Sequence, residues 1–180
     1  MIHKGTIEIE TERLILRRFQ LEDAQMMFDN WASDSEVTKF LSRETNQSVS
    51  ETEQTINRWM EWNENLDNYH WAIVEKESNQ VIGSITKISS EDNHLKCEIG
   101  YCISRDKWNK GITTEATKAV IEFLFAIGYK RIQATHDEEN DFSGKVLLKV
   151  GMEFEGRLRN YINGTETVSY THLRAHETRG

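Results

Sequence analysis

Hydrophobic positions along this chain follow two periods, and the change from one to the other marks the expected elements. Cys97–Ile103 is dense in apolar and β-branched residues, which is typical of a largely buried strand. From Ala116 to Ile127 apolar residues return at steps of three and four, so they share one helical face, and Gly128 follows as a stop signal. The pattern predicts a strand and a helix joined by a polar turn at 106–115.

The first half of the chain shows the same two periods. Thr11–Arg18 alternates as a strand does, and the next segment predicts a helix with one apolar stripe. A second helix is expected further on, with Ser50 and Glu53 as its capping box. Trp62 lies off the apolar stripe of that helix, so it either lines a substrate cleft or packs in a helix buried on more than one side. The stripes contain Ala24, Met27, Phe28 and Trp31 in the first helix, and Ile56, Trp59 and Met60 in the second.

Strand patterns dominate the rest of the chain. Trp71–Glu75 and Val81–Ile88 predict two adjacent strands around a short turn. Lys130–Thr135 follows the central helix as a further strand, which implies a right-handed crossover between parallel strands. Phe154–Ile162 and Thr165–Thr171 flank an Asn-Gly pair and predict a hairpin.

One short helix is expected between the strand Lys130–Thr135 and the strand Phe154–Ile162. Lys145–Val150 precedes Gly151, and either Asp141 or Ser143 can cap its start.

Composition limits the class of protein. The chain has 180 residues, 37% of them hydrophobic and 29% charged, which suits one domain with its own core. A net charge of −8 disfavours a nucleic-acid partner and suits a cationic one. Cys97 and Cys102 have an odd spacing within one strand, so their side chains should point to opposite faces and stay unpaired, as in a reducing compartment. With no apolar signal core at Met1–Gly5 and no stretch of membrane-spanning length, we expect a cytoplasmic protein that does not bind membranes.

The turn before the central helix has the features of an anion site. The first turn of a helix presents unpaired N–H groups and the positive end of its dipole, and a phosphate accepts both. No Walker or Rossmann pattern accompanies the turn. For the turn alone, an ordinary strand–helix joint containing Lys and Gly is an equal alternative.

Further residues decide between these alternatives. The run Trp108-Asn109-Lys110-Gly111-Ile112-Thr113-Thr114-Glu115-Ala116, after Glu98-Ile99-Gly100-Tyr101, resembles the pyrophosphate-binding motif of the GNAT superfamily of N-acyltransferases. It is closest to the RimJ/RimL-like branch, the ribosomal-protein N-acetyltransferases. Two positions depart from that motif: Asn109 replaces a glycine and Thr113 replaces a small residue. The opening Thr11-Glu12-Arg13-Leu14 and the pair Asn140 and Ser143 also resemble this branch, and the resemblance spans about Glu10 to Tyr161.

The resemblance implies a fold, a donor and a binding site. It implies a single α/β (α+β) GNAT domain with a mixed, mostly antiparallel sheet of about six or seven strands and about four helices. The sheet is expected to splay at the strands carrying Glu98 and Ala134, where acetyl-CoA inserts its pantetheine arm, and no metal is expected. The implied acetyl-CoA-binding residues are Ile103, Asn109, Lys110, Gly111, Ile112, Thr113, Thr114 and Asn140.

Two catalytic residues are expected. Glu98 is the candidate base, since partial burial raises a carboxylate pKa toward the working range, although a structural Glu98 paired with an arginine is an equal alternative. Some relatives place a base where this chain has Asn160, which cannot take a proton, so a water relay is a rival. Ser143 is the candidate donor to the leaving thiolate, with plain helix capping as its alternative. His70, His94 and His136 do not share a metal-ligand spacing with the cysteines, and His136 is either a substrate contact or a solvated loop residue.

The expected activity is acetyl transfer from acetyl-CoA to a primary amine. The acceptor is expected to be a protein N-terminal α-amino group, such as that of a basic ribosomal protein, or a small molecule: a polyamine, an amino-acid derivative or an antibiotic. A non-catalytic acyl-CoA-binding module is the alternative from another class, and the protein is expected to be a monomer or homodimer. The acetyltransferase domain is expected to span 1–168, and the polar residues 169–180 are expected to form a non-native or disordered tail.

Overall fold

A single mixed sheet organises the computed structural model, which describes residues 1–41, 44–162 and 165–174. Its strands in spatial order are β1, β2, β3, β4, β5, β6, β8 and β7. All neighbouring strands are antiparallel except β5 and β6. The strands are β1 (Ile9–Glu10), β2 (Leu14–Arg17), β3 (His70–Glu75), β4 (Gln80–Glu91), β5 (Lys96–Ile103), β6 (Arg131–Asp137), β7 (Glu153–Ile162) and β8 (Thr165–Leu173).

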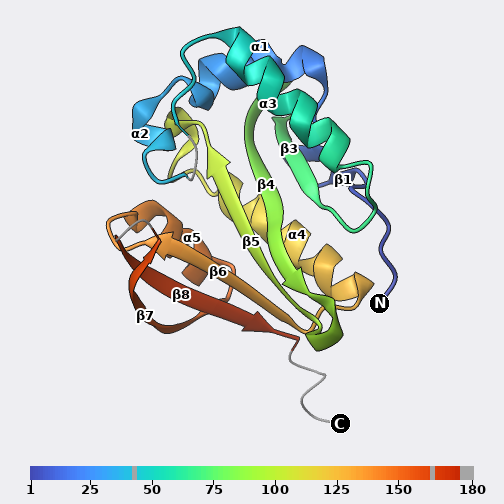
Figure 1. Cartoon of the computed structure of the whole chain (residues 1–180), viewed down its shortest axis with the longest axis vertical. Coiled ribbons are helices and arrows are strands. Elements are labelled where there is room, and N and C mark those ends of the chain that lie inside the picture. The colour runs from blue at the N-terminus through green and yellow to red at the C-terminus, as the bar shows by residue number, and fades with distance from the viewer. Residues whose placement is uncertain (42–43, 163–164, 175–180) are drawn as a thin grey trace.

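The two parallel strands separate after a short pairing (Figure 1). They pair at three positions, of which Glu98 with Gln133 is the last. Beyond it β5 continues to Ile103 beside β4, and β6 continues to Asp137 beside β8. The splay expected at Glu98 and Ala134 is therefore present, and it opens a wedge in the middle of the sheet.

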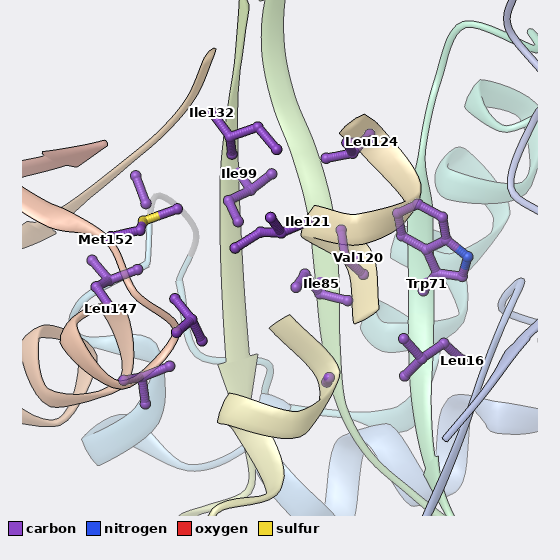
Figure 2. Packing of buried hydrophobic residues seen from close by; sticks show 14 of the residues in the cluster. Leu16, Trp71, Ile85, Ile99, Val120, Ile121, Leu124, Ile132, Leu147 and Met152 are labelled. Atoms are coloured by element: carbon purple, nitrogen blue, oxygen red, sulfur yellow. The ribbon is translucent and has the colours of Figure 1, made fainter. Parts of the chain in front are cut away.

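Helices cover both faces of the sheet. One hydrophobic cluster joins α4 (Ile112–Ile127) and α5 (Asp141–Lys149) to the strands, and Figure 2 shows Val120, Ile121 and Leu124 of α4 beside strand residues such as Ile85 and Ile99. A second cluster joins the other face to α1 (Ala24–Met27), α3 (Val49–Trp62) and the π-helical turn Phe28–Ala32. The short helix α2 (Ser35–Thr38) and the 3₁₀ turns Leu21–Asp23, Asp92–His94 and Arg105–Lys107 complete the chain's described helices. The described part thus has eight strands and five α-helices, slightly more than expected, in the expected fold.

The two cysteines lie on opposite faces of β5, as their odd spacing predicts. Cys97 belongs to the cluster under α4, and Cys102 belongs to the cluster under α1 and α3. Both cysteines are buried, and burial raises the pKa of Cys97 to about 12. Cys97 is therefore a neutral core residue.

Two helix starts differ from their predicted positions. The cap of α3 is Ser48, whose hydroxyl accepts from the N–H of Glu51, while the Glu51 carboxylate accepts from the N–H of Gln47. The predicted pair Ser50 and Glu53 is two residues too late, because the sequence repeats the same Ser-x-x-Glu spacing. Likewise Asn140, rather than Asp141 or Ser143, caps α5.

The C-terminal strand extends beyond the boundary expected at residue 168. Residues Ser169 to Leu173 continue β8 and pair with β6 from Thr135 to Arg131. Tyr170 and Thr171 are buried, so this stretch completes the sheet and is not an unpacked tail. Polar side chains alternate with its few apolar residues, so the sequence pattern gives only a weak strand signal over this stretch. Residues 175–180 and the turn pair 163–164 lie outside the described part.

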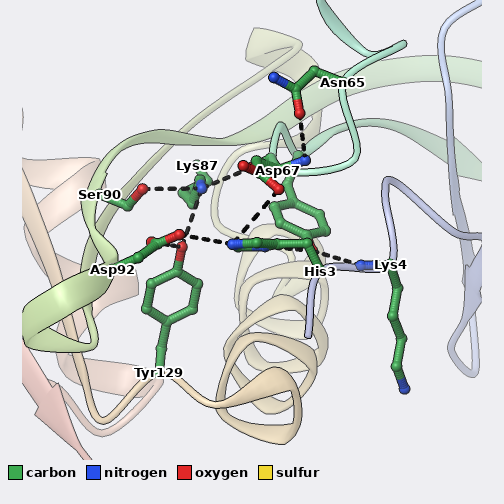
Figure 3. A network of polar contacts seen from close by, with 9 residues as sticks. His3, Lys4, Asn65, Asp67, Lys87, Ser90, Asp92 and Tyr129 are labelled. Atoms are coloured by element: carbon green, nitrogen blue, oxygen red, sulfur yellow. Dashed lines mark hydrogen bonds and ion pairs between the residues drawn. The ribbon is translucent and has the colours of Figure 1, made fainter. Parts of the chain in front are cut away.

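A polar network fastens four distant segments to one another (Figure 3). The carboxylate of Asp92 accepts from the hydroxyl of Tyr129 at 2.7 Å and contacts Nε2 of His3 at 2.7 Å. Lys87 is buried beside them and donates to Tyr129, Ser90 and the carbonyl of Asp67. The network joins the N-terminal segment, the loop before β3, the end of β4 and the loop after α4.

Candidate active site

The wedge between β5 and β6 opens into a cleft of about 760 Å³. A volume of this size suits a substantial organic ligand. Glu98, Ile103, Asn140 and Ser143, four of the residues expected at the site, line this single cleft. His136 and Trp62 line it too, which favours the cleft alternative for both.

The turn before α4 has the backbone geometry of an anion site. Asn109 has φ +61° and Gly111 has φ +77°, both in the left-handed region that asparagine and glycine tolerate best. Gly111 is the N-cap of α4, so the first N–H groups of this helix follow it directly. Asparagine at 109 thus preserves the backbone that a glycine would adopt there.

A small hollow lies against this turn. It is lined by turn residues and by α5, and its free volume of about 10 Å³ is close to that of one water-sized probe. Thr113 lines it and is buried, and its hydroxyl has no hydrogen-bond partner among the described residues. Lys110 and Ile112, also expected here, are absent from its described lining, and Ile112 is packed in the core. The lining residues are Lys107, Asn109, Gly111, Thr113, Thr114, Phe142, Lys145, Val146 and Lys149.

Cations surround the hollow. Lys107, Lys145 and Lys149 line it, and of these Lys107 is ion-paired with Glu75. Three lysines beside a helix N-terminus create a local positive potential in a chain whose net charge is −8. A phosphate is larger than this hollow, so it would lie at the surface of the turn, where the positive potential favours an anion.

Residues near the start of the chain form hydrogen bonds that hold the turn in place. Arg13 donates to the carboxylate of Glu115 at 2.7 Å and to the carbonyl of Lys110 at 3.1 Å, and Thr11 also binds Glu115. Residues that carry the resemblance in two distant places therefore contact each other. They hold the turn and the first turn of α4 against β2.

Glu98 faces the cleft without a cationic partner in the described part of the chain. Burial raises the pKa of Glu98, and a hydrogen bond from Nε2 of Gln133 at 3.2 Å partly offsets that effect. Among the described residues, therefore, no arginine pairs with Glu98 as the structural alternative would require. A half-buried carboxylate with a raised pKa has the properties that a general base needs. The side chain of Asn160 lies outside the described residues.

The start of α5 presents Ser143 to the cleft. Asn140 accepts from the N–H of Ser143 at 3.3 Å and donates through Nδ2 to the Ser143 hydroxyl oxygen at 3.1 Å. Asn140 supplies the cap and donates to the Ser143 hydroxyl oxygen, so the hydroxyl proton is available to donate to a ligand. The hydroxyl of Tyr101 donates to the carbonyl of Ser143 at 2.9 Å and fixes this turn against β5.

Several cleft residues were not predicted from the sequence. Tyr101 and Arg58 line the cleft, and Trp108 stacks on Phe142 with 5.2 Å between ring centroids. Phe142 lines both the cleft and the small hollow, so it stands between them. Periodicity could not identify these side chains, because each also suits an ordinary strand, helix or loop position.

The described residues contain no group of three or more His, Cys, Asp or Glu side chains placed to hold a metal ion. None of their helices combines the length and apolar character that crossing a bilayer requires.

A sheet splayed between two parallel strands, with a basic turn at the start of α4, is the arrangement that the resemblance to acyl-CoA-dependent transferases implies. Residues 13–153 match the family model described as an acetyltransferase (GNAT) domain, and the chain belongs to that family of enzymes. GNAT domains use acetyl-CoA, and the cleft and the basic turn fit such a donor.

Relatives support the same assignment. The uncharacterised N-acetyltransferase YoaA of Bacillus subtilis is 32% identical over 160 residues, covering 87% of this chain and 90% of YoaA. The [ribosomal protein uS5]-alanine N-acetyltransferase of Escherichia coli is 23% identical over 162 residues, covering 87% of this chain and 83% of that enzyme. A GNAT-family acetyltransferase structure from Bacillus anthracis superposes with a TM-score of 0.81 at 26% identity, covering 93% of this chain and 98% of that one. The chain is similar to N-acetyltransferases over nearly its whole length.

Proposed function

We propose that this protein transfers the acetyl group of acetyl-CoA to a primary amine, with the amine and the thioester meeting beside Glu98. The observation that carries the proposal is the cleft, which brings Glu98 together with Asn140 and Ser143, although Glu98 lies more than 40 residues before them along the chain.

Each group has a role that its surroundings support. Glu98 removes the proton from the attacking ammonium, because its carboxylate is half-buried and has a raised pKa. Ile103 and Asn140 hold the pantetheine arm, and the turn Asn109–Thr114 holds the pyrophosphate. Ser143 donates a hydrogen bond to the leaving sulfur, which takes up the proton that the newly acetylated nitrogen releases, so that the serine stays neutral.

Two acceptor classes belong to this proposal. A protein N-terminal α-amino group is supported by the similarity to a uS5-alanine N-acetyltransferase and by the net charge of −8, which would attract a basic protein. A small amine is supported by the cations in the described lining of the cleft, Lys39, Arg58 and Lys87, because they would repel a basic protein. We favour the small amine, because charges at the site act on the acceptor more strongly than distant surface charges do.

The test is a transfer assay with purified protein. Acetyl-CoA is incubated with small amines and with peptides that have free N-termini, and release of the CoA thiol is measured together with the mass of the product. Thiol release that depends on an amine, with a gain of one acetyl group on it, is the expected result. Tight acetyl-CoA binding in calorimetry without turnover on any acceptor would instead identify a non-catalytic acyl-CoA-binding module.

A cytoplasmic location and a monomeric or homodimeric state are part of the same proposal. Cys97 and Cys102 lie on opposite faces of β5 and do not bond to each other, which is consistent with a reducing compartment. Size-exclusion chromatography with light scattering measures the oligomeric state directly.

A further inference from the structure

The cleft has two halves that different elements line. One half consists of β5, β6 and the start of α5, where the proposed function places acetyl-CoA. The other half consists of α3, the segment before it, and the facing parts of β3 and β4. This second half, which we call the acceptor half, includes Lys39, Phe40, Arg58, Trp59, Trp62, His70 and Lys87.

Charges in the acceptor half are mainly positive. Its lining includes Lys39, Arg58 and Lys87, whereas Asp137 at the end of β6 belongs to the donor half and Glu98 lies where the halves meet. The global charge of −8 does not describe this local surface, since at physiological salt a charge is largely screened beyond about 8 Å.

Arg58 is the cation with capacity to bind a ligand. Lys39 is ion-paired with Glu36, and Lys87 is buried with three oxygen partners. Arg58 is exposed, and its Nη2 donates a hydrogen bond to the Thr55 hydroxyl at 3.2 Å. It forms no ion pair in the described part of the chain. A guanidinium has five N–H donors in a planar fork, so most of them remain for an oxyanion.

The position of Arg58 is fixed by its own helix. Thr55 is buried, and its hydroxyl in turn donates to the carbonyl of Glu51 at 3.2 Å, which orients the oxygen that Arg58 contacts. Trp62 lies one turn after Arg58, on the same side of α3, and is 39% exposed. Trp59 packs edge-on against His70, with 4.3 Å between ring centroids. An anchored cation beside exposed aromatic surface forms the acceptor wall.

From this wall we infer that the acceptor is a small amine that carries an oxyanion, a carboxylate or a phosphate, and that Arg58 binds that oxyanion while Trp59 and Trp62 contact the rest of the molecule. The inference rests on the proposed function, whose acceptor class it specifies. Arg58 is then a specificity-determining residue, and a basic peptide N-terminus is a poor acceptor because its cationic side chains meet Arg58.

The experiment compares acceptors that differ in the oxyanion alone. Phenylalanine is compared with phenylalaninamide, and O-phosphoethanolamine with ethanolamine, by kcat/KM for thiol release. We expect at least one oxyanion-bearing member to exceed its uncharged partner by about 10-fold or more, because hydrogen bonds to charged groups are strong. The first pair detects a carboxylate and the second a phosphate. The amine of phenylalaninamide is the less basic of its pair, so amine reactivity alone would favour the uncharged member.

Variants connect the preference to Arg58. The ratio of kcat/KM for the oxyanion-bearing member to that for its uncharged partner should fall to about 1 in Arg58→Gln and below 1 in Arg58→Glu. The change should come through KM of the acceptor, while KM of acetyl-CoA and activity on the uncharged amine stay the same. Arg58→Lys should retain part of the preference, because it keeps the charge and loses the fork. Lys118→Gln, on the exposed side of α4, removes a cation far from the cleft lining and should change nothing.

The outcomes separate the two proposals. Equal activity on both members of each pair, or a preference that survives Arg58→Glu, overturns the inference and leaves the acetyltransferase proposal standing. Faster acetylation of basic peptides than of the oxyanion-bearing amines also overturns it. Absence of amine-dependent thiol release with every acceptor rejects the proposed function itself. Circular dichroism melting curves of the Arg58 variants confirm that each is folded.

Discussion

At the scale of single residues, Glu98 combines a proposed catalytic role with a half-buried carboxylate. If it is the base, Glu98→Gln should lower the rate by about 100-fold or more while acetyl-CoA still binds. The acidic limb of the pH–rate profile should also disappear, since the group that must lose its proton is gone. Steady-state kinetics across pH, with calorimetry for acetyl-CoA, measures both effects. A variant that keeps its rate and its acidic limb would transfer the role to a bound water.

Stability supplies an independent control on Glu98. Burial raises the pKa of this carboxyl in the folded protein, so its stabilising contribution is present at low pH and is lost as pH rises through the folded value. Glu98→Gln should therefore be no less stable than the wild type at neutral pH. Gln133→Leu removes the hydrogen bond that lowers this pKa, so it should move the acidic limb of the rate profile to higher pH.

Thr113 is a residue at which the chain departs from its family motif. Its hydroxyl is buried without a hydrogen-bond partner in the described structure, and its side chain narrows the hollow at the anion-binding turn. Thr113→Ala should raise stability by up to about 1 kcal/mol and tighten acetyl-CoA binding, because it removes an unsatisfied group and opens the hollow. Urea titration and calorimetry measure the two effects, with Thr117→Ala as the control, since it removes another buried hydroxyl without a described partner from outside the described lining of the hollow. Weaker binding would show that the Thr113 hydroxyl contacts the ligand.

At the scale of elements, the turn before α4 is the part that we propose binds the pyrophosphate of acetyl-CoA. Gly111 is left-handed, and a Cβ there would meet Nη2 of Arg13 at 3.5 Å, which is ordinary contact. Backbone strain of about 1 kcal/mol is therefore the main cost of a side chain at this position. Gly111→Glu should abolish acetyl-CoA binding by adding a negative charge, whereas Gly111→Asn should retain the fold and much of the affinity. Equal binding by both variants would remove this turn from the site.

Strand β8 offers a test of the C-terminal boundary. Ending the chain after Val168 removes Ser169–Leu173, which pair with β6 and include buried Tyr170 and Thr171. We expect a fall of several degrees in Tm, or a protein that does not fold, because β6 and β7 each lose part of the strand with which they pair. Ending it after Arg174 keeps the whole strand and should leave Tm nearly unchanged. Equal melting of the two truncations would mean that this part of β8 contributes little.

The elements that the sequence predicts well are those with long, clean periodicity. The strand Cys97–Ile103 and the helix ending before Gly128 match β5 and α4, because one face of each is buried over its whole length. Elements of two to four residues, such as β1 and α2, carry too few positions for a period. Helix caps were misplaced where the chain offers competing polar residues, as at Ser48 and Ser50.

At the scale of the whole molecule, the turn that we propose binds the pyrophosphate could be recognised in the sequence, whereas the acceptor wall could not. The turn is contiguous in sequence, so its glycine, its lysine and the helix after it can be recognised together. The cleft draws its lining from segments between Val37 and Thr167 that only the fold brings together. Arg58 carries no local signal, since an exposed arginine on a helix is usually a solvated surface residue.

The network around Asp92 links these distant segments, and its charge gives a last prediction. Burial alone would raise the pKa of Asp92, but hydrogen bonds from Tyr129 and His3 outweigh burial and hold it below the usual range. A carboxyl with a lowered pKa stabilises the folded state above the usual aspartate range, and that contribution is lost as pH falls through the folded value.

Asp92→Asn should therefore be less stable than the wild type at neutral pH, and its unfolding free energy should fall less steeply on acidification. Urea titrations between neutral pH and the aspartate range measure this slope. Glu53→Gln, which removes an exposed carboxylate from α3, is the control and should keep the wild-type slope. If Asp92→Asn keeps that slope as well, the acid sensitivity belongs to other carboxylates, and the contacts of Asp92 with His3 and Tyr129 join the segments through geometry alone.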